Sequence, residues 1–386
     1  MPQNKGKGKN RKIGYIDFNL IFVVLLLLGF GLIMVYSTSS YSASMSSGSN
    51  NDPAFYLKKQ VVATIFGLGA MVFMTFWPYR WWMNLATPAY FVAIGLIGLV
   101  LTPLGIEANG ARRWLNLGVS LQPAEVAKLA MIIFLATIIV KMGDKIDTPR
   151  GFIFALASPG FVAALIYVIT DNLSSAIIVM AIAFIMLFIA SPQYKIFVYI
   201  VAGGAALVAI IVFLASKVFT GGGFRLARIR AWLSPEDYAT GTGYQTLQAL
   251  YAIGSGGTFG KGLGQSTQKL GFIPEAQNDM IFSIICEELG LFGGLCVLIL
   301  FLLMLWRMLI IAINTKDMFG ELLVVGVMSH IAVQVIFNVA VVTNIIPNTG
   351  ISLPFISYGG SSVMFLLMEV GLVFSVGRSI KFETVE

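Results

Sequence analysis

Residues 271–290 read GFIPEAQNDMIFSIICEELG, and this stretch passes from a loop into a long apolar run. Pro274 suits the first turn of a helix, and Glu275 suits the positive end of the helix dipole. Asp279 then falls where the chain should cross the membrane surface. An ionisable side chain at that depth is costly to keep, so Asp279 is a functional candidate.

Apolar runs recur along the whole chain. Of its 386 residues, 58% are hydrophobic and only 11% are charged, and the mean hydropathy is +0.87. Soluble domains carry about 25% charged residues, so the composition predicts an all-α polytopic membrane protein. The net charge of +7 comes from scattered cations, which favours a cytoplasmic surface and anionic lipid over nucleic acid.

Hydropathy predicts about ten transmembrane helices. The predicted spans are Ile16–Tyr36, Leu57–Phe76, Trp81–Leu101, Pro123–Val140, Phe152–Ile169, Leu173–Ala190, Tyr194–Ser216, Met280–Trp306, Glu321–Val342 and Pro354–Val376. An even number of spans places both termini on one side, and Lys and Arg concentrate in the segments that would then be cytoplasmic. We therefore expect one membrane domain over residues 1–386, with a basic cytoplasmic tail at 1–12 and a cytoplasmic tail at 377–386.

A large structured extracytoplasmic loop is expected at residues 217–278, between the seventh and eighth helices. Arg225 and Arg228 in this loop lie three residues apart, on one helical face. The segment 243–254, GYQTLQALYAIG, is amphipathic and too short to span a bilayer. It is typical of an interfacial or re-entrant helix.

The glycine-rich stretch GGTFGKGLG at residues 256–264 follows in the same loop. It fails the phosphate-loop pattern because Gly262, not Ser or Thr, follows Lys261. Two interpretations stay open: a flexible turn, or a backbone that approaches a lipid-linked pyrophosphate together with Lys261.

Several charged residues lie close to or inside the predicted membrane. Glu125 and Lys128 share one helix face and should pair, and a structural ion pair is favoured over a substrate contact or a proton relay. Arg112, Arg113 and Trp114 lie in an outer loop. There they either form an interfacial belt or hold a phosphate and an apolar chain.

Three further sites have a simpler expected role. Asp171 precedes the sixth span, where an N-cap is the default. His330, the only histidine, lies inside an apolar run, which favours a hydrogen-bonded contact between helices over a proton relay. Helical rotation places Glu287 and Glu288 about 80° and about 180° from Asp279, so at least one of them should bond a neighbouring helix.

The stretch NTGISLPFISYGGSS at residues 348–362 combines Pro354, two glycines and several serines at a membrane edge. A broken helix end with exposed backbone groups would suit the lining of a cavity. The start of a tightly packed helix is the alternative.

These separate stretches together resemble the SEDS family, whose members include FtsW, RodA and SpoVE. The matching residues are GARRWLNLG at 110–118, QPAEVAK at 122–128, GYQ at 243–245 with Gln248, AIGSGG at 252–257, QKL at 268–270, PE at 274–275 with Asp279, EELG at 287–290, and LPFISYGGSS at 353–362. Each motif is weak alone, but their shared order covers essentially the whole chain and is highly specific.

The resemblance implies a peptidoglycan glycosyltransferase that polymerises lipid II at the outer face of the bacterial cytoplasmic membrane. The family's P-E-x-H-T-D-F pattern places its proposed catalytic aspartate on Asp279. Family members commonly have His-Thr before this aspartate and Phe after it, whereas this chain has Gln277, Asn278 and Met280. The missing imidazole removes any proton transfer by that histidine.

The expected step is inverting, with Asp279 as general base and undecaprenyl pyrophosphate as leaving group. No organic cofactor is expected, and a divalent cation, Mg²⁺ or Mn²⁺, could share the pyrophosphate charge with the cations. The predicted substrate-binding residues are Arg113, Trp114, Glu125, Lys128, Arg225, Arg228, Gln245, Gln248, Lys261, Lys269, Ser357 and Ser361.

The resemblance also implies partners: a class B penicillin-binding protein and other membrane proteins of the division or elongation machinery. Division or sporulation is favoured over elongation. The alternative function is a lipid II flippase or transporter, which the charges of Glu125, Lys128 and Glu369 would also suit. A scaffold that recruits other proteins would not need Asp279.

Overall fold

The computed structural model describes residues 16–108, 111–116, 118, 120–192, 194–217, 224–241 and 243–380. Within these residues, nine helices are long and apolar enough to cross a membrane. They are α1 (Phe18–Met45), α2 (Phe55–Phe76), α3 (Trp81–Leu99), α4 (Pro123–Met142), α5 (Pro149–Thr170), α6 (Leu173–Ala190), α10 (Ile281–Asn314), α11 (Met318–Val342) and α12 (Gly360–Gly377). The predicted tail 1–12 lies outside the described residues, as do residues 381–386 of the predicted tail 377–386.

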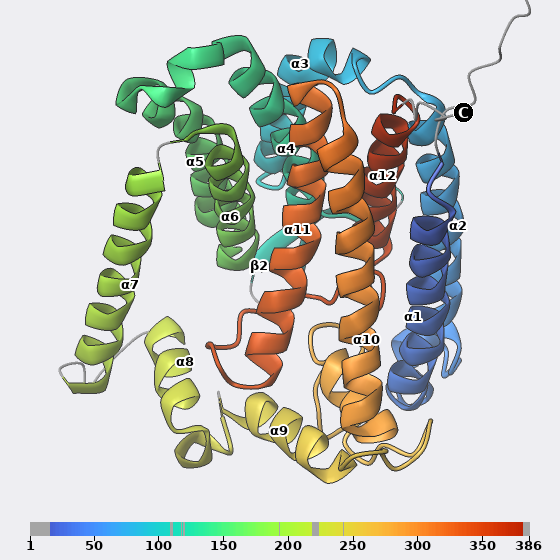
Figure 1. Ribbon diagram of the computed structural model, residues 1–386. Coiled ribbons are helices and arrows are strands. Elements are labelled where there is room, and N and C mark those ends of the chain that lie inside the picture. Colours follow the sequence, from blue (N-terminus) through green and yellow to red (C-terminus); the bar gives the residue numbers. More distant parts are fainter. Residues whose placement is uncertain are drawn as a thin grey trace, which may run out of the picture.

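The helices α11 and α12 form the centre of the bundle. In the most apolar 18-residue stretch of each helix, 72% of the residues of α11 and 78% of those of α12 are buried, whereas only 22% are buried in α3 at the rim. Helix α11 packs against α4, α6, α10 and α12 (Figure 1). A side chain on α11 can therefore contact several segments that are far apart in the sequence.

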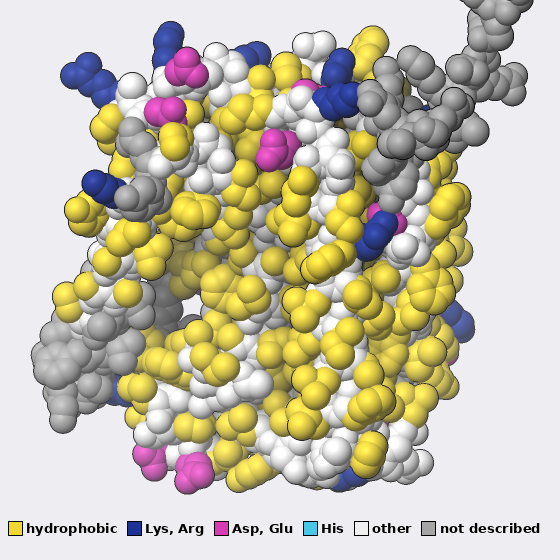
Figure 2. Space-filling view, viewed as in Figure 1, with side chains coloured by type: hydrophobic (Ala, Val, Ile, Leu, Met, Phe, Trp, Pro, Cys, Tyr) yellow, Lys and Arg dark blue, Asp and Glu magenta, His cyan; other side chains and the backbone are white. Residues whose placement is uncertain are grey.

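The seventh predicted span, Tyr194–Ser216, corresponds to α7 (Tyr194–Lys217), which is helical over 24 residues and stands apart from the bundle in Figure 1. Its apolar part among the described residues is Lys195–Ala206. Near the start of α7, the ring of Phe197 packs on Phe152 of α5 and Phe184 of α6. Figure 2 shows a hollow in this face of the molecule, with hydrophobic side chains of the described residues along part of its edge.

Between α3 and α4 the chain forms a small antiparallel sheet that the all-α prediction did not include. Its strands are β1 (Gly105–Ala108), β2 (Ala111–Asn116) and β3 (Ser120–Leu121), in the order β1-β2-β3. Leu115 is buried and its neighbour Asn116 is exposed. Alternation of this kind is typical of a half-covered strand.

The segment predicted as the large loop contains short helices, which lie together at one end of the bundle (Figure 1). These are α8 (Phe224–Leu233), the 3₁₀ helix η3 (Pro235–Tyr238) and α9 (Tyr244–Gly256). Two more 3₁₀ helices, η1 (Ser47–Ser49) and η2 (Gly143–Asp147), follow α1 and α4.

Two helices begin later than the sequence predicts. Helix α10 begins at Ile281 and not near Pro274, because Glu275 has a left-handed backbone (φ 49°) that a helix does not tolerate. Helix α12 begins at Gly360 and not at Pro354, and Phe355 is likewise left-handed (φ 62°). The two irregular segments bind each other, since the backbone N–H of residue 358 donates to the carbonyl of residue 277 (2.9 Å).

Helix α10 is interrupted at Gly290, whose backbone is non-helical (φ 71°, ψ −172°). The glycine-rich turn inserts at this break. The N–H groups of Leu291 and Phe292 donate to the carbonyls of Gly257 and Thr258 (2.9 and 3.0 Å). The turn at 256–264 therefore has a defined packing role against α10.

We expect Gly290→Ala to lower the free energy of unfolding by roughly 3 kcal/mol or more, because of strain and overpacking. An added Cβ would lie 2.3 Å from the Thr258 carbonyl oxygen, at a positive φ. Thermal unfolding in detergent measures the effect. Gly69→Ala is the matched control, because nothing lies within 4 Å of its added Cβ. Equal unfolding temperatures for the two variants would contradict the packing role.

Candidate active site

Asp279 lies in the turn directly before α10, next to the N-cap residue Met280, and is partly exposed. Its backbone carbonyl accepts a hydrogen bond from the side chain of Asn338 on α11 (2.7 Å). In the described part of the chain, no cation forms an ion pair with this carboxylate. An acid in this state is available to accept a proton.

Arg228 and Asp279 connect charged groups from four separate segments. Arg228 of α8 interacts electrostatically with Asp279, Asp171 and Arg113. Arg113 of β2 donates from Nη2 to the backbone carbonyl of Asp171 (2.9 Å), at the junction of α5 and α6. Glu275 adds a second negative charge near Asp279. The sequence-predicted residues Arg113, Arg228 and Asp279 therefore do come together.

Burial raises the pKa of the Asp279 carboxyl from its usual value of 3.8 to about 6. The negative charge of Glu275 also raises this pKa, whereas the N–H of residue 279 and the charge of Arg228 lower it. A carboxylate with such a pKa is ionised at neutral pH and is a stronger base than an exposed one.

A cavity of about 250 Å³ opens next to these charges. It is lined by Arg228, Trp232, Tyr244, Gln245 and Asn348, among other residues. The side chain of Asn348 donates to Gln245 Oε1 (2.9 Å), and Nη1 of Arg228 donates to the Asn348 carbonyl (3.4 Å). Gln245 thus lies at the cavity, and Gln248 follows one turn later on α9.

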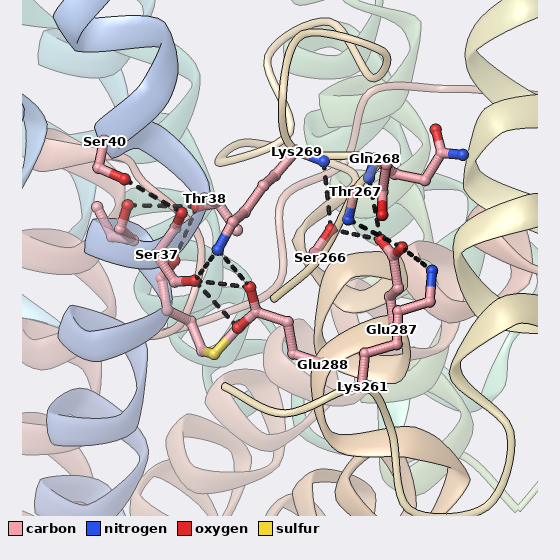
Figure 3. Close-up of polar contacts among 12 residues, drawn as sticks. Ser37, Thr38, Ser40, Lys261, Ser266, Thr267, Gln268, Lys269, Glu287 and Glu288 are labelled. Carbon is pink, nitrogen blue, oxygen red and sulfur yellow. Dashed lines mark hydrogen bonds and ion pairs between the residues drawn. The ribbon is translucent and has the colours of Figure 1, made fainter. Parts of the chain in front are cut away.

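Lys261 and Lys269, two predicted substrate ligands, lie in ion pairs with the paired glutamates of α10 (Figure 3). Lys261 Nζ lies 2.7 Å from Glu287 Oε1, and Lys269 Nζ lies 2.7 Å from Glu288 Oε1. Ser37 of α1 also donates to Glu288 (2.8 Å), so the prediction that a glutamate bonds a neighbouring helix is confirmed. Both glutamates are fully buried, so the network fixes the loop to α10 and α1.

Glu125 and Lys128 form the predicted ion pair, with Lys128 Nζ 2.8 Å from Glu125 Oε1 and both side chains buried. Deeper in the bundle, His330 Nδ1 of α11 lies 2.7 Å from Glu369 Oε2 of α12. The expected helix-contact role of His330 is confirmed. Glu125 and Lys128 interact electrostatically with this second pair, so α4, α11 and α12 share one buried polar cluster.

Four other residues were predicted to bind substrate, and the structure places them as follows. The hydroxyl of Ser357 accepts a hydrogen bond from the Leu353 N–H (2.8 Å), whereas the buried Ser361 hydroxyl has no partner within the described chain. Trp114 of β2 is partly buried. Arg225 belongs to α8, and its side chain lies outside the described residues.

The N-cap expectation for Asp171 is wrong. Asn172 caps α6, and its side chain accepts the N–H of Ser175 (3.0 Å). Asp171 has a left-handed backbone (φ 47°) at the end of α5 instead. Its place beside Arg113 makes it part of the charged site.

Sequence reasoning missed Asn338. It lies eight residues after His330 on α11, and Gln334 lies midway, so polar residues recur at the helical period in an apolar span. That recurrence was a usable signal. Asn348 begins the stretch 348–362, for which cavity lining was one interpretation, and it does line the cavity. Its partners Gln245 and Arg228 gave no signal, because they are distant in sequence.

Comparison with known proteins adds independent information. A family model for FtsW, RodA and SpoVE, described as "Cell cycle protein", matches residues 18–381. Stage V sporulation protein E of Bacillus subtilis is 40% identical over 369 residues, which cover 94% of this chain and 97% of that protein. A probable peptidoglycan glycosyltransferase FtsW of Trichlorobacter lovleyi is 36% identical, covering 96% of this chain and 95% of the relative.

Two solved structures share the fold. One comes from a study of a peptidoglycan synthase complex that coordinates polymerisation and crosslinking; it has a TM-score of 0.75 and 26% identity, over 95% of this chain and 99% of that chain. The other is the rod shape determining protein RodA of Thermus thermophilus. Its TM-score is 0.65 at 26% identity, over 95% of this chain and 98% of that chain.

Proposed function

Since this chain belongs to the FtsW, RodA and SpoVE family of multi-pass membrane proteins, we propose that it is a peptidoglycan glycosyltransferase that polymerises lipid II. The reaction would take place at the outer face of the cytoplasmic membrane, with both termini in the cytoplasm. The observation that carries this proposal is Asp279, a carboxylate with a pKa of about 6 that interacts electrostatically with Arg228, a residue that lines the cavity.

In the proposed reaction, Asp279 takes the proton from the C4 hydroxyl of one lipid-linked disaccharide. The resulting oxygen attacks the anomeric carbon of a second disaccharide, and the bond from that carbon to the pyrophosphate breaks with inversion. A base on the nucleophile's face is the requirement for such a single displacement. Pyrophosphate leaves without a strong general acid where its charge is stabilised.

Arg113 and Arg228 are the cations best placed for the pyrophosphate, because Arg228 interacts electrostatically with both Asp279 and Arg113. A divalent cation, Mg²⁺ or Mn²⁺, could share this charge. In this proposal Lys261 and Lys269 do not bind substrate directly, since each already pairs with a buried glutamate.

The lipid tails would enter from the side. The hollow in the face shown in Figure 2 has hydrophobic side chains of the described residues along part of its edge, which supports a lateral path for a polyprenyl chain. The headgroup would then reach the charged site near α8.

A class B penicillin-binding protein is the proposed partner, together with other membrane proteins of the division or elongation machinery. A structural neighbour from a peptidoglycan synthase complex supports this partner. Similarity to a sporulation protein at 40% identity and to FtsW at 36% supports a role in sporulation or division.

A lipid II flippase stays the second candidate, because Glu125, Lys128, His330 and Glu369 place ionisable groups inside the bundle. A flippase requires a polar path through the membrane, whereas a polymerase requires an acid near the surface beside a structured loop. In the buried cluster these groups contact one another, Lys128 with Glu125 and His330 with Glu369, which favours the polymerase.

Purified protein with labelled lipid II tests the function. We expect glycan strands, with a rate that falls as the pH drops through about 6, because protonation of Asp279 removes the base. Arg228→Gln should move this acid limb to higher pH, since loss of a nearby positive charge raises the pKa of Asp279. Lipid translocation in vesicles without any polymer, with or without the penicillin-binding protein, would instead support the flippase.

A further inference from the structure

The side-chain amide of Asn338 joins two segments of the charged site. It lies on α11 and is fully buried. Its Nδ2 donates to the carbonyl of Asp279 and to the carbonyl of Ile351, both at 2.7 Å. One NH₂ group therefore connects the turn before α10 with the segment that leads to α12.

We propose that Asn338 is a positioning residue for glycosyl transfer, holding Asp279 against the turn at residues 348–351. The inference rests on the proposed function, in which Asp279 is the general base. Asn338 does not touch substrate, and it acts through the backbone of Asp279.

The turn that Asn338 holds forms one side of the site. Gly350 has a positive φ (70°), and a Cβ added there would lie 3.8 Å from Asp279 Oδ2. Asn348 in the same turn bonds both Gln245 and Arg228. If the turn moved relative to Asp279, the base would also move relative to Arg228 and the cavity.

The Asn338 side chain is fixed by its Nδ2 alone. Its Oδ1 is buried and has no hydrogen-bond partner in the described residues. An unsatisfied buried acceptor costs about 1–3 kcal/mol. Gln334 on the same helix also has a buried oxygen without a partner, so the two hydrogen bonds from Nδ2 are what distinguish Asn338.

Gln334 is a matched control on the same helix. It lies one turn before Asn338, is also buried (3% exposed), and also has an unpartnered side-chain oxygen. Both residues fall on one face of α11. No hydrogen bond joins Gln334 to Asp279 among the described residues.

The test compares Asn338→Ala with Gln334→Ala in lipid II polymerisation by the purified protein. We expect Asn338→Ala to lower kcat by roughly 10- to 100-fold, the effect of a misplaced reacting group, with KM unchanged. Gln334→Ala should keep the kcat of the wild type. Equal kcat losses in the two variants would overturn the proposal, because they would indicate a general effect on α11.

Asn338→Asp is the second variant, because it keeps the shape of the side chain. An ionised carboxylate there would face the carbonyl oxygens of Asp279 and Ile351, which only accept hydrogen bonds, so the buried carboxyl should hold its proton and donate one hydrogen bond where the amide donates two. We therefore expect Asn338→Asp to recover part of the kcat that Asn338→Ala loses. A kcat for Asn338→Asp no higher than that of Asn338→Ala would count against positioning through this hydrogen bond.

A parallel assay of Asp279→Asn separates the two hypotheses. If Asp279→Asn is inactive while Asn338→Ala keeps full kcat, only the positioning role fails. If Asp279→Asn polymerises at the wild-type rate, the base assignment fails and the positioning role fails with it.

Discussion

Asp279→Asn should lower the rate of lipid II polymerisation by about 100- to 10,000-fold, the usual contribution of a general base. The amide has nearly the same size, so the turn before α10 and the hydrogen bond from Asn338 to the Asp279 carbonyl should remain. What is lost is the group that accepts the hydroxyl proton. The measurement is the initial rate of strand formation from labelled lipid II, with thermal unfolding as a check on folding.

Glu275→Gln is the matched control for Asp279→Asn, since it neutralises a carboxylate in the same turn. Glu275 raises the pKa of Asp279, so its loss should lower that pKa and move the acid limb of the pH–rate profile to lower pH. Activity at neutral pH should be kept. A control variant as inactive as Asp279→Asn would show that the whole turn, and not one base, is required.

Lys128→Met should destabilise the protein by about 3–5 kcal/mol, because it leaves the carboxylate of Glu125 buried without its partner. Lys128 is 1% exposed and Glu125 is 6% exposed, so water cannot replace the lost ammonium. Thermal unfolding in detergent should show the loss. Neutralising both partners, in Glu125→Gln with Lys128→Met, should recover much of it.

Lys58→Met provides the contrasting case. Its ion pair with Asp52 is short (2.6 Å), but the lysine side chain is 70% exposed. Exposed pairs contribute about 0–1 kcal/mol, so the unfolding temperature should change little. If Lys128→Met were as mild as Lys58→Met, the buried cluster would not hold α4 against α11 and α12.

The spans were predictable because hydropathy is local. Leu173–Ala190 was predicted with the bounds it has, and Phe55–Phe76 begins two residues before its predicted start at Leu57. The helix starts at Pro274 and Pro354 were wrong for a non-local reason. The backbone N–H of residue 358 donates to the carbonyl of residue 277, and this bond joins the two non-helical segments that precede α10 and α12.

Asp279 also stood out from the sequence, because one acid at the edge of an apolar run has few structural uses. The residues around Asp279 could not be predicted in the same way. Arg228 and Lys261 both lie in the predicted loop at residues 217–278. Nothing local in that loop indicated that Arg228 would interact with Asp279 while Lys261 would pair with Glu287.

The sequence by itself thus determined a membrane bundle, its approximate spans and the identity of the acid, since these depend on residue type and local periodicity. Only the tertiary structure decided that Arg228 is the arginine that interacts with Asp279 and that Asn338 holds the backbone of Asp279. The reason is physical: the partner of a buried charge or amide is set by helix packing between residues that are far apart in the chain.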